Sequence, residues 1–387
     1  MISKKLREQM EVIIDGCLEC KSKPCMKTCI MLNEFGENPK EILKNCIEKN
    51  EIPDKMVYSC NMCNRCTVVC PKNFRIQDIF MESRVMKIKE NNGKSPIKGH
   101  KAIEAHQYLG YSTIFNTVNK APNGKKTKRI FFPGCSLPSY NSKAVGNILD
   151  FLQEKYDGEI GSILKCCGKP TKSLGQIEAF EKRYATVQKA IDDTGAEEII
   201  VACQSCYKIF KEHNPNQKVI SLWEILPKLG LPEHAIGIGK DSDVVFGIHD
   251  SCATRDNKDI QDGVRWILGQ MEYKVEEPEN TRGKTRCCGF GGMVVPANPE
   301  IAHAVRTKRG IEYKTDHMVS YCAACRESME TIGKDSDVVF GIHDSCATRD
   351  NKDIQDGVRW ILGQMEYKVE EPENTRGKTN VVVLEGW

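Results

Sequence analysis

Apolar positions recur at helical spacing in the first hundred residues of the chain. Asn38-Pro39 begins a predicted helix, because it combines an N-cap side chain with a proline at the first helical position. Ile42 and Cys46 fall on one face of that helix, so Cys46 is expected to be a core residue. A second helix is expected over residues 76–89. The amino-terminal part of the chain is therefore predicted to be a helical module.

After residue 128 the pattern changes to short apolar strands that alternate with helices. Strands are predicted at 129–132, 199–201, 244–248 and 318–321. A cysteine follows each of these strands, namely Cys135, Cys203, Cys252 and Cys322. The alternation is typical of α/β sheets, which assemble their sites at the carboxyl ends of the strands. The expected fold class is α+β multidomain, with an α-helical module followed by two α/β domains.

Cysteine density divides the chain into domains. One cysteine-rich block runs from Cys17 to Cys70 and a longer one from Cys135 to Cys325, and the interval between them contains no cysteine. Turn-forming residues lie within that interval, so we expect it to hold a linker. The expected organisation is a helical module at 1–100, a linker at 101–128, α/β domains at 129–238 and 239–332, and a tail at 333–387.

The tail is mostly an unchanged repeat. Residues Ile332–Thr379 repeat Ile238–Thr285 without a single difference. Structural repeats normally diverge, because each unit has to keep only a pattern. We interpret the second copy as a recent duplication or a splice in the sequence. Its cysteine, Cys346, has no companion cysteines after it and is not expected to be a ligand.

Twenty cysteines in 387 residues are the most informative feature of the composition. The chain is long enough to bury a core without disulfides and begins without a secretory signal, so a cytoplasmic location is expected. In that compartment the cysteines are expected to be metal ligands or redox groups. The formal net charge of +3 excludes a broad basic surface for nucleic acid. A mean hydropathy of −0.45, without a long apolar run, excludes a membrane span.

One run of cysteines has the spacing that holds a [4Fe-4S] cubane cluster. The run is Cys60-x2-Cys63-x2-Cys66-x3-Cys70-Pro71. A zinc site would use four ligands in two pairs and would leave the third cysteine unexplained. The run therefore predicts an iron–sulfur cluster.

An earlier run has a two-residue insertion and Ile30 in place of the proline, and it completes a two-cluster ferredoxin pattern. Its cysteines are Cys17, Cys20, Cys25 and Cys29. In two-cluster ferredoxins the fourth cysteine of each run binds the other cluster. The expected ligand sets are Cys17, Cys20, Cys25 and Cys70 for one cubane and Cys29, Cys60, Cys63 and Cys66 for the other.

A five-cysteine pattern occurs twice in the remaining chain. The copies are Cys135-x30-Cys166-Cys167-Gly168-x34-Cys203-x2-Cys206 and Cys252-x34-Cys287-Cys288-Gly289-x32-Cys322-x2-Cys325. Adjacent cysteines do not easily occupy two corners of one cube, and the glycine after them allows a tight turn against a large inorganic ligand. Five thiolates exceed the four that a cubane needs. The excess indicates either an open cluster with a bridging thiolate or a dithiol that cycles to a disulfide.

The doubled pattern behind a ferredoxin module resembles the cysteine-rich CCG-domain proteins. These include the B-type and D-type subunits of heterodisulfide reductase and the iron–sulfur subunits of glycolate, lactate and glycerol-3-phosphate oxidases. The resemblance covers about residues 10 to 332, and the order of the parts is similar to the D-type, which fuses the separate C-type and B-type subunits. It implies two CCG domains, each holding a noncubane [4Fe-4S] cluster beside the two cubanes. The implied ligands are Cys135, Cys166, Cys167, Cys203 and Cys206 in the first and Cys252, Cys287, Cys288, Cys322 and Cys325 in the second.

The resemblance implies an iron–sulfur electron-transfer subunit of an oxidoreductase complex. Electrons from a flavin-containing partner subunit would pass through the cubanes to the noncubane clusters, which would reduce a disulfide. The residues implied as catalytic are Cys166, Cys167, Cys287 and Cys288. The alternative is a pure relay, which takes electrons from a 2-hydroxy-acid or flavoprotein dehydrogenase to quinone or another carrier. No nucleic acid partner is expected, and any contact with a membrane would be made through a partner subunit.

Two further motifs have structural explanations. His249-Asp250 could feed protons to a cluster-bound sulfur, but a hydrogen-bonding pair at the end of a strand is more common. Gly289-Phe290-Gly291-Gly292 lacks the spacing of a phosphate-binding loop. This glycine-rich segment is instead expected to pack closely over a cluster.

Overall fold

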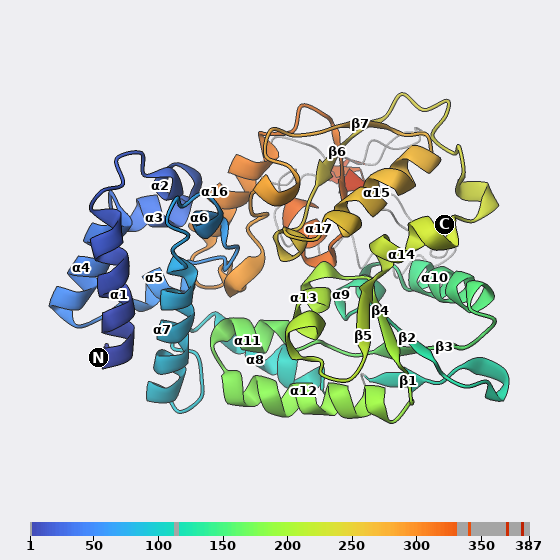
Figure 1. Ribbon diagram of the computed structural model, residues 1–387, viewed down its shortest axis with the longest axis horizontal. Coiled ribbons are helices and arrows are strands. Elements are labelled where there is room, and N and C mark those ends of the chain that lie inside the picture. The colour runs from blue at the N-terminus through green and yellow to red at the C-terminus, as the bar shows by residue number, and fades with distance from the viewer. Residues whose placement is uncertain (1, 112–115, 331–339, 342–368, 371–380, 383–387) are drawn as a thin grey trace.

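Three lobes make up the computed structural model of the chain (Figure 1). It describes residues 2–111, 116–330, 340–341, 369–370 and 381–382. The helical module lies at the left of Figure 1, and two α/β units lie one above the other beside it. The mixture of a helical amino-terminal part with two sheets agrees with the expected fold class.

The helical module is built from short helices around a small core. These are α1 (Lys4–Cys17), α2 (Pro24–Thr28), α3 (Ile30–Phe35), α4 (Pro39–Lys49), α5 (Asp54–Tyr58), α6 (Arg65–Val68) and α7 (Ile76–Glu90). The side chain of Asn38 accepts a hydrogen bond from the Glu41 amide at 2.9 Å, which caps α4 as expected. Cys46 is only 3% exposed and belongs to the core, so that prediction is confirmed. The second predicted helix corresponds to α7.

The first α/β unit contains a five-stranded sheet in the order β1-β3-β2-β4-β5. Its strands are β1 (Thr117–Asn119), β2 (Arg129–Phe132), β3 (Ile160–Leu164), β4 (Glu198–Val201) and β5 (Lys218–Ser221). All are parallel except β1, which pairs antiparallel with β3. The helices are α8 (His100–Leu109), α9 (Ser136–Tyr140), α10 (Ser142–Lys155), α11 (Lys169–Leu174), α12 (Ile177–Asp192), α13 (Gln204–His213) and α14 (Leu222–Leu229).

The second α/β unit repeats this topology in a parallel sheet of order β11-β8-β6-β7. Its strands are β6 (Val245–His249), β7 (Lys274–Glu276), β8 (His317–Ser320) and β11 (Val381–Val382). Its helices are α15 (Lys258–Gln270), α16 (Pro299–Gly310) and α17 (Ala323–Glu330). Short 3-10 turns occur at η2 (Pro122–Gly124), η3 (Glu233–Ala235), η4 (Cys252–Thr254), η5 (Arg282–Lys284) and η6 (Gly291–Met293). In both units the first long strand, β2 or β6, lies between the next two of the same unit.

Most of the tail, including Cys346, lies outside the described residues. Three short strands of the tail are described. β9 (Phe340–Gly341) pairs with β10 (Val369–Glu370), and β11 pairs with β8 of the second unit. The tail thus adds a strand to the sheet of the second unit.

In the segment 101–128, which was expected to be a linker, the described residues 101–111 and 116–128 are structured and contact the first unit. It contains nearly all of α8 and the edge strand β1. Gln107 of α8 is fully buried and faces the first unit, although it is polar. The sequence pattern did not predict this helix. Turn-forming residues mark chain reversals and give no information about the structure of the residues between them.

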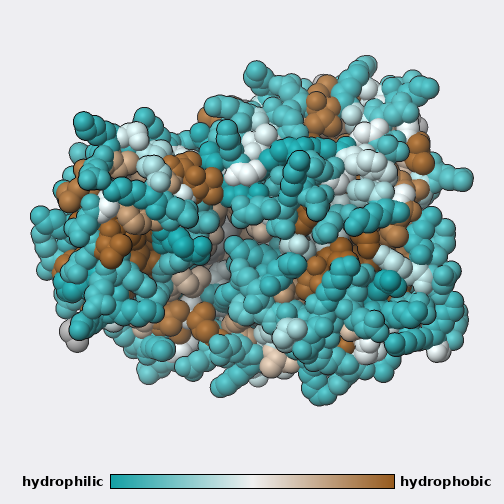
Figure 2. Space-filling model, in the orientation of Figure 1, coloured by the Kyte–Doolittle hydropathy of each residue, from teal (hydrophilic) through white to brown (hydrophobic). Residues whose placement is uncertain are grey.

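Two hydrophobic cores hold the three lobes together. One core runs without a break through both α/β units. The other is the core of the helical module, and Val294, Ile301 and Ala302 of the second unit belong to it. Within the described residues, no helix has both the length and the apolar character needed to cross a membrane. On the face shown in Figure 2, hydrophobic residues form separate patches among hydrophilic ones.

Candidate iron–sulfur sites

Parallel strands bring the cysteines that follow them to one edge of each sheet. In the first unit β2 and β4 end level, with Phe132 opposite Val201, so Cys135 and Cys203 leave the sheet at the same edge. The strands β6 and β8 are paired in the same way in the second unit. Each sheet therefore gathers its cysteines at its carboxyl edge, as ligand sites in α/β sheets usually are.

The cysteines of the helical module gather in two groups of four. The first ferredoxin set consists of Cys17, Cys20, Cys25 and Cys70, and burial together with the three neighbouring thiols raises the pKa of Cys17. The second ferredoxin set consists of Cys29, Cys60, Cys63 and Cys66. Each set takes three cysteines from one run and the fourth from the other. The structure thus brings together the groups that the spacing indicates, and that they bind iron stays a prediction.

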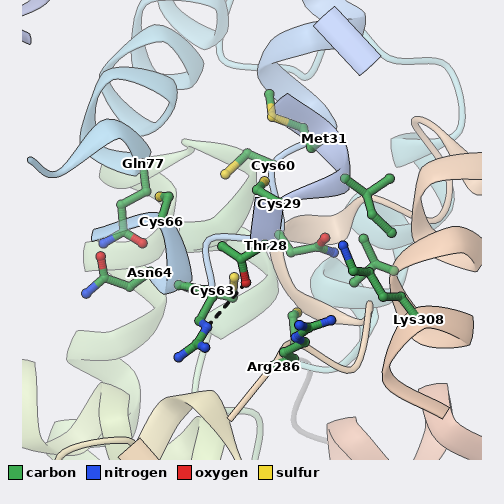
Figure 3. Close-up of a pocket in the computed structure, with 15 residues that line it drawn as sticks. Thr28, Cys29, Met31, Cys60, Cys63, Asn64, Cys66, Gln77, Arg286 and Lys308 are labelled. Atoms are coloured by element: carbon green, nitrogen blue, oxygen red, sulfur yellow. Dashed lines mark hydrogen bonds between the residues drawn. The ribbon is translucent and has the colours of Figure 1, made fainter. Parts of the chain in front are cut away.

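The second ferredoxin set surrounds a cavity, and Figure 3 shows its sulfur atoms around a common space. Burial raises the pKa of Cys29 to about 12 and that of Cys60 to about 11. Arg286 and Lys308 of the second α/β unit form part of the wall of this cavity. The site is therefore completed by residues from a different lobe.

Left-handed residues shape the loops of both ferredoxin sets. The lengthened loop between Cys20 and Cys25 includes Lys23, which has φ 42° and directly precedes Pro24 at the start of α2. In the second run Met62 and Asn64 have φ of 54° and 61°. Such angles are uncommon for residues other than glycine. The insertion is thus absorbed before α2 begins, so that Cys25 still reaches its set.

The ten cysteines of the doubled pattern form two groups of five. The first CCG set consists of Cys135, Cys166, Cys167, Cys203 and Cys206, and the second CCG set of Cys252, Cys287, Cys288, Cys322 and Cys325. Hydrogen bonds from Cys135 and from Cys167 lower the pKa of Cys166, and one from Cys287 lowers that of Cys288. The two adjacent cysteines thus interact with each other in both sets.

The glycine of each Cys-Cys-Gly triplet has a definite role. Gly168 and Gly289 adopt φ of 82° and 88°, which other residues rarely adopt. In this conformation each glycine donates its amide to the sulfur two residues earlier. The distances are 3.5 Å from Gly168 to Cys166 Sγ and 3.3 Å from Gly289 to Cys287 Sγ. The expected tight turn is therefore present in both copies.

Two residues that sequence reasoning missed contact the first CCG set. Gln107 Nε2 donates to Cys166 Sγ at 3.4 Å, and Gln107 Oε1 of the same side chain accepts from Thr171 Oγ1 at 3.0 Å. The Tyr111 hydroxyl donates to the Cys166 carbonyl at 2.8 Å. Both residues lie in the segment expected to be a linker. The signal that could have found Gln107 is its place on the same face of α8 as the buried His100.

His249 lies beside the second CCG set. One of its ring nitrogens and the sulfurs of Cys288 and Cys325 lie within 4.8 Å of one another. Arg309 Nε donates to His249 Nδ1 at 3.1 Å, and an arginine can only donate. The neutral ring therefore carries its proton on Nε2.

Asp250 has a structural role at the end of β6. Its carboxylate accepts hydrogen bonds from Arg265 at 2.9 Å, from the Tyr321 hydroxyl at 3.0 Å and from the Arg282 amide at 2.7 Å. These contacts join β6 to the segment before the Cys-Cys-Gly triplet and to the segment after β8. The hydrogen-bonding explanation therefore holds for Asp250.

Three of the four sets form a connected series through two contacts. A hydrogen bond with Cys287 lowers the pKa of Cys63 to about 6, so the second ferredoxin set touches the second CCG set. A hydrogen bond from Cys203 lowers the pKa of Cys322, so the two CCG sets also touch. The second CCG set is therefore the middle member between the ferredoxin module and the first CCG set.

Arg84 of α7 binds all three lobes at one point. Its side chain is fully buried and donates to the carbonyl oxygens of Val57, Cys60, Ser173 and Gly292 at 2.5–3.2 Å. Within the described residues it forms no ion pair with a carboxylate. A buried cation normally needs a counter-charge. Sequence reasoning did not find this residue, since an arginine in an amphipathic helix is usually exposed.

The glycine-rich segment packs directly on the second ferredoxin run. A side chain at Gly291 would overlap the carbonyl of Asn61, and one at Gly292 would overlap that of Cys60. The side-chain Nδ2 of Asn61 in turn donates to the backbone carbonyls of Gly289 and Gly291 at 2.9 and 3.1 Å. The segment therefore packs against a cysteine loop, and glycine permits this close approach.

The residues present fit iron–sulfur clusters. Burial and neighbouring thiols hold several of these thiols in the protonated state at neutral pH, as the raised pKa of Cys17, about 11, also shows. Groups of four and five thiols suit a metal cation that replaces the protons. The ferredoxin sets would hold cubanes, and each five-cysteine set offers one thiolate more than a cubane requires.

Comparison with known proteins identifies the parts of the chain. The profile of the cysteine-rich (CCG) domain matches residues 130–211 and 246–330, and that of the 4Fe-4S dicluster domain matches residues 16–75. An uncharacterized iron–sulfur protein of Methanococcus maripaludis is 24% identical over 353 residues, which cover 81% of this chain and 66% of that protein. This chain thus spans slightly less than two thirds of that relative.

Two other relatives are components of oxidoreductases. One, a component of the fumarate reductase (CoM/CoB) of Methanothermobacter marburgensis, is 25% identical, over 82% of this chain and 68% of that protein. The other, a component of the dihydromethanophenazine:CoB–CoM heterodisulfide reductase of Methanosarcina acetivorans, is 24% identical, over 78% of each. With both profiles matched in order, the chain is an iron–sulfur protein that combines a 4Fe-4S dicluster domain with cysteine-rich CCG domains.

Proposed function

We propose that this chain is the electron-carrying subunit of an oxidoreductase complex and that it delivers electrons from a flavin-containing partner subunit to a disulfide. The observation that carries the proposal is the connected series of thiol sets. Cys63 contacts Cys287, and Cys322 contacts Cys203. The relative named as part of a heterodisulfide reductase supports the same class of substrate.

Iron–sulfur clusters accept and release single electrons when they are bound. The protein's contribution is to hold the thiol sets in a fixed order and to bury most of the CCG cysteines. Eight of the ten CCG cysteines are buried, and the second ferredoxin set is closed by Arg286 and Lys308 of the second α/β unit. Burial excludes water and oxidants from these sites. The first CCG set, which contacts the second CCG set through Cys203 and Cys322, lies at the end of the series.

The partner subunit supplies the electrons that the proposed reaction needs. A disulfide R–S–S–R′ takes up two electrons and two protons, the S–S bond breaks, and the thiols RSH and R′SH leave. The electrons come from the reduced flavin of the partner and the protons from solvent. We assign the reacting positions to the two adjacent cysteine pairs, Cys166-Cys167 and Cys287-Cys288.

A relay that hands electrons to a non-disulfide acceptor is the second candidate. The observation that favours it is the relative named as part of a fumarate reductase. In a relay the chain would conduct electrons without binding a substrate.

An anaerobic turnover experiment distinguishes these functions. Protein isolated without oxygen is expected to contain about 16 iron atoms if each set holds four. A reduced viologen dye serves as the donor, and a panel of small disulfides is added. Reoxidation of the dye by a disulfide, with release of two thiols, supports the proposal. Reoxidation by a quinone or flavoprotein alone supports the relay, and stoichiometric zinc in place of iron contradicts both.

A further inference from the structure

Histidine and phenylalanine occupy equivalent positions in the two CCG units. His249 ends β6 and Phe132 ends β2, each three residues before the first cysteine of its set. The strand register also agrees, since His249 lies opposite Ser320 of β8 and Phe132 lies opposite Val201 of β4. Each of these partners lies two residues before the Cys-x2-Cys pair of its unit. The two sets therefore differ at a matched position, which holds a polar ring in the second unit and an apolar ring in the first.

The imidazole ring of His249 is buried, and one of its nitrogens accepts a hydrogen bond from the protein. The residue is 1% exposed, and Arg309 Nε donates to its Nδ1 at 3.1 Å. The Tyr313 hydroxyl lies 3.0 Å from the same nitrogen. Because Nδ1 accepts, the proton of the neutral ring lies on Nε2. Within the part of the chain that the structure describes, Nε2 has no hydrogen-bond partner. A buried N–H group in this state is rare and calls for an acceptor.

The sulfurs of Cys288 and Cys325 are acceptors within reach of this ring. These sulfurs and a ring nitrogen of His249 lie within 4.8 Å of one another, and all three side chains are buried. Since Nδ1 accepts from Arg309, Nε2 is the nitrogen that can donate to a sulfur. Thiolate sulfurs carry negative charge when a metal replaces their protons, so they accept hydrogen bonds more strongly than thiols do. The free N–H of His249 therefore fits a metal-loaded set better than an empty one.

The matched ring of the first unit cannot donate a hydrogen bond. Phe132 is fully buried, and its ring packs edge-on against that of Phe210, with 4.7 Å between the ring centres. A hydrocarbon ring offers neither a donor nor an acceptor. The first CCG set receives a hydrogen bond from Gln107 of α8, which lies outside the sheet. A donor at the end of the first long strand is thus a feature of the second unit that the first does not share.

We propose that His249 donates a hydrogen bond from Nε2 to a sulfur of the iron–sulfur cluster in the second CCG set and thereby raises the reduction potential of that cluster. Hydrogen bonds to the sulfurs are among the factors that set such potentials. A reduced cluster carries one more negative charge than the oxidised one, so the donor stabilises the reduced state more. The inference requires that this set binds iron, as the proposed function assumes. It makes His249 a hydrogen-bond donor to the cluster and not an iron ligand.

Three replacements of His249 separate the effect of the donor from that of the shape of the ring. His249→Phe copies the matched residue of the first unit and removes both ring nitrogens. His249→Asn keeps an acceptor near the position of Nδ1 for Arg309 but is too short to place a donor at the position of Nε2. His249→Gln is long enough to place its amide N–H there. The potential of each cluster is measured at one fixed pH by anaerobic titration with dithionite, followed by the paramagnetic signals.

The phenylalanine and asparagine variants should keep their iron and should lower the potential of the second CCG cluster alone. We expect the equilibrium constant for its reduction to fall about tenfold, which corresponds to about 59 mV for one electron. His249→Gln should lose less than about half of this shift, because it restores the donor. His317→Phe is the matched control and should change no potential. His317 is a half-buried histidine at the other end of the same strand pair, opposite Phe246.

Three results would overturn this inference and leave the proposed function standing. One is an unchanged potential in the phenylalanine and asparagine variants with their iron retained. Another is a shift of equal size in all three variants, because it would show that the shape of the ring matters and its donor does not. The third is a loss of iron in all three variants, which would identify His249 as a ligand. Wild-type protein that binds no iron would overturn both the inference and the proposed function.

Discussion

The two CCG units share a sheet order and a cysteine pattern but differ in what covers their sites. In the second unit the glycine-rich segment lies on the Cys60 loop, and Cys287 contacts Cys63 of the ferredoxin module. In the first unit Cys135 is exposed, and the set borders a cavity. The five-cysteine pattern therefore lies in the interior of the series in the second unit and at its open end in the first unit.

The five-cysteine motif thus sets the local geometry, whereas the surrounding residues determine whether its site is covered or open. The glycine that donates to a sulfur is the same in both units. The contacts that distinguish them come from elsewhere in the chain, such as α8 for the first unit and the ferredoxin loops for the second. Altering those neighbours one at a time should therefore affect the two units differently.

The largest effect is expected from Gly292→Ala, which should detach the ferredoxin module from the second unit. The new methyl group would overlap the carbonyl of Cys60, in a residue whose φ is 70°. We expect a loss of about 4 kcal/mol or more in unfolding free energy, measured by anaerobic denaturation. Gly93→Ala is the matched control, because its φ is 82° and no atom lies near the added carbon. It should cost only about 1 kcal/mol of backbone strain. Equal losses would show that the two surfaces are not closely packed.

Arg84→Met is expected to destabilise the junction of all three lobes. It removes the donors of four buried carbonyl groups, each of which costs about 1 kcal/mol or more when left without a partner. Removal of a buried cation that has no carboxylate partner among the described residues offsets part of this cost, so we expect a net loss of about 3 kcal/mol, again measured by denaturation. Arg75→Met, at the start of the same helix, removes only an exposed ion pair with Asp78 and should cost less than about 1 kcal/mol. A similar loss in the two variants would contradict the role given to Arg84.

The smallest effect is expected from Gln107→Leu. It removes the donor to Cys166 and leaves the second unit untouched. We expect a loss of about 1 kcal/mol and faster release of about four iron atoms to a chelator, with the remainder released at the wild-type rate. Gln188→Leu on α12 removes hydrogen bonds with Asp192, Gln217 and Asn214 and none with a cysteine of the described residues, so it should leave the rate of iron release unchanged. Faster release of all the iron would show that Gln107 does not act on one site alone.

Sequence reasoning was most successful where the pattern is local. The N-cap at Asn38, the helix after residue 76 and the strands before Cys135 and Cys203 follow from a few neighbouring residues. Strands β3, β5 and β7 were not predicted. The short β7, with all three residues exposed, offers no apolar run to detect.

The candidate site was predictable only in part, because the cysteine spacing is a local pattern and the contacts between the sets are not. Cysteine spacing indicates which thiols gather, because one loop must wrap one cluster. It does not indicate which sets touch, since the contact of Cys63 with Cys287 depends on how three lobes pack. Arg84 and Gln107 act through such packing, and neither belongs to a recognisable motif.

A rapid-freeze kinetic measurement can test whether the second CCG set lies between the ferredoxin module and the first CCG set. In one variant both Cys287 and Cys288 are replaced by serine, and in the other both Cys166 and Cys167. Each should lose about four iron atoms. After mixing with a fast one-electron donor and rapid freezing, the variant that lacks Cys166 and Cys167 should still reduce its second CCG set at the wild-type rate. The variant that lacks Cys287 and Cys288 should reduce the ferredoxin sets but fill the first CCG set far more slowly, because the middle member of the series is missing. Reduction of the first CCG set at the wild-type rate in that variant would contradict the proposed order.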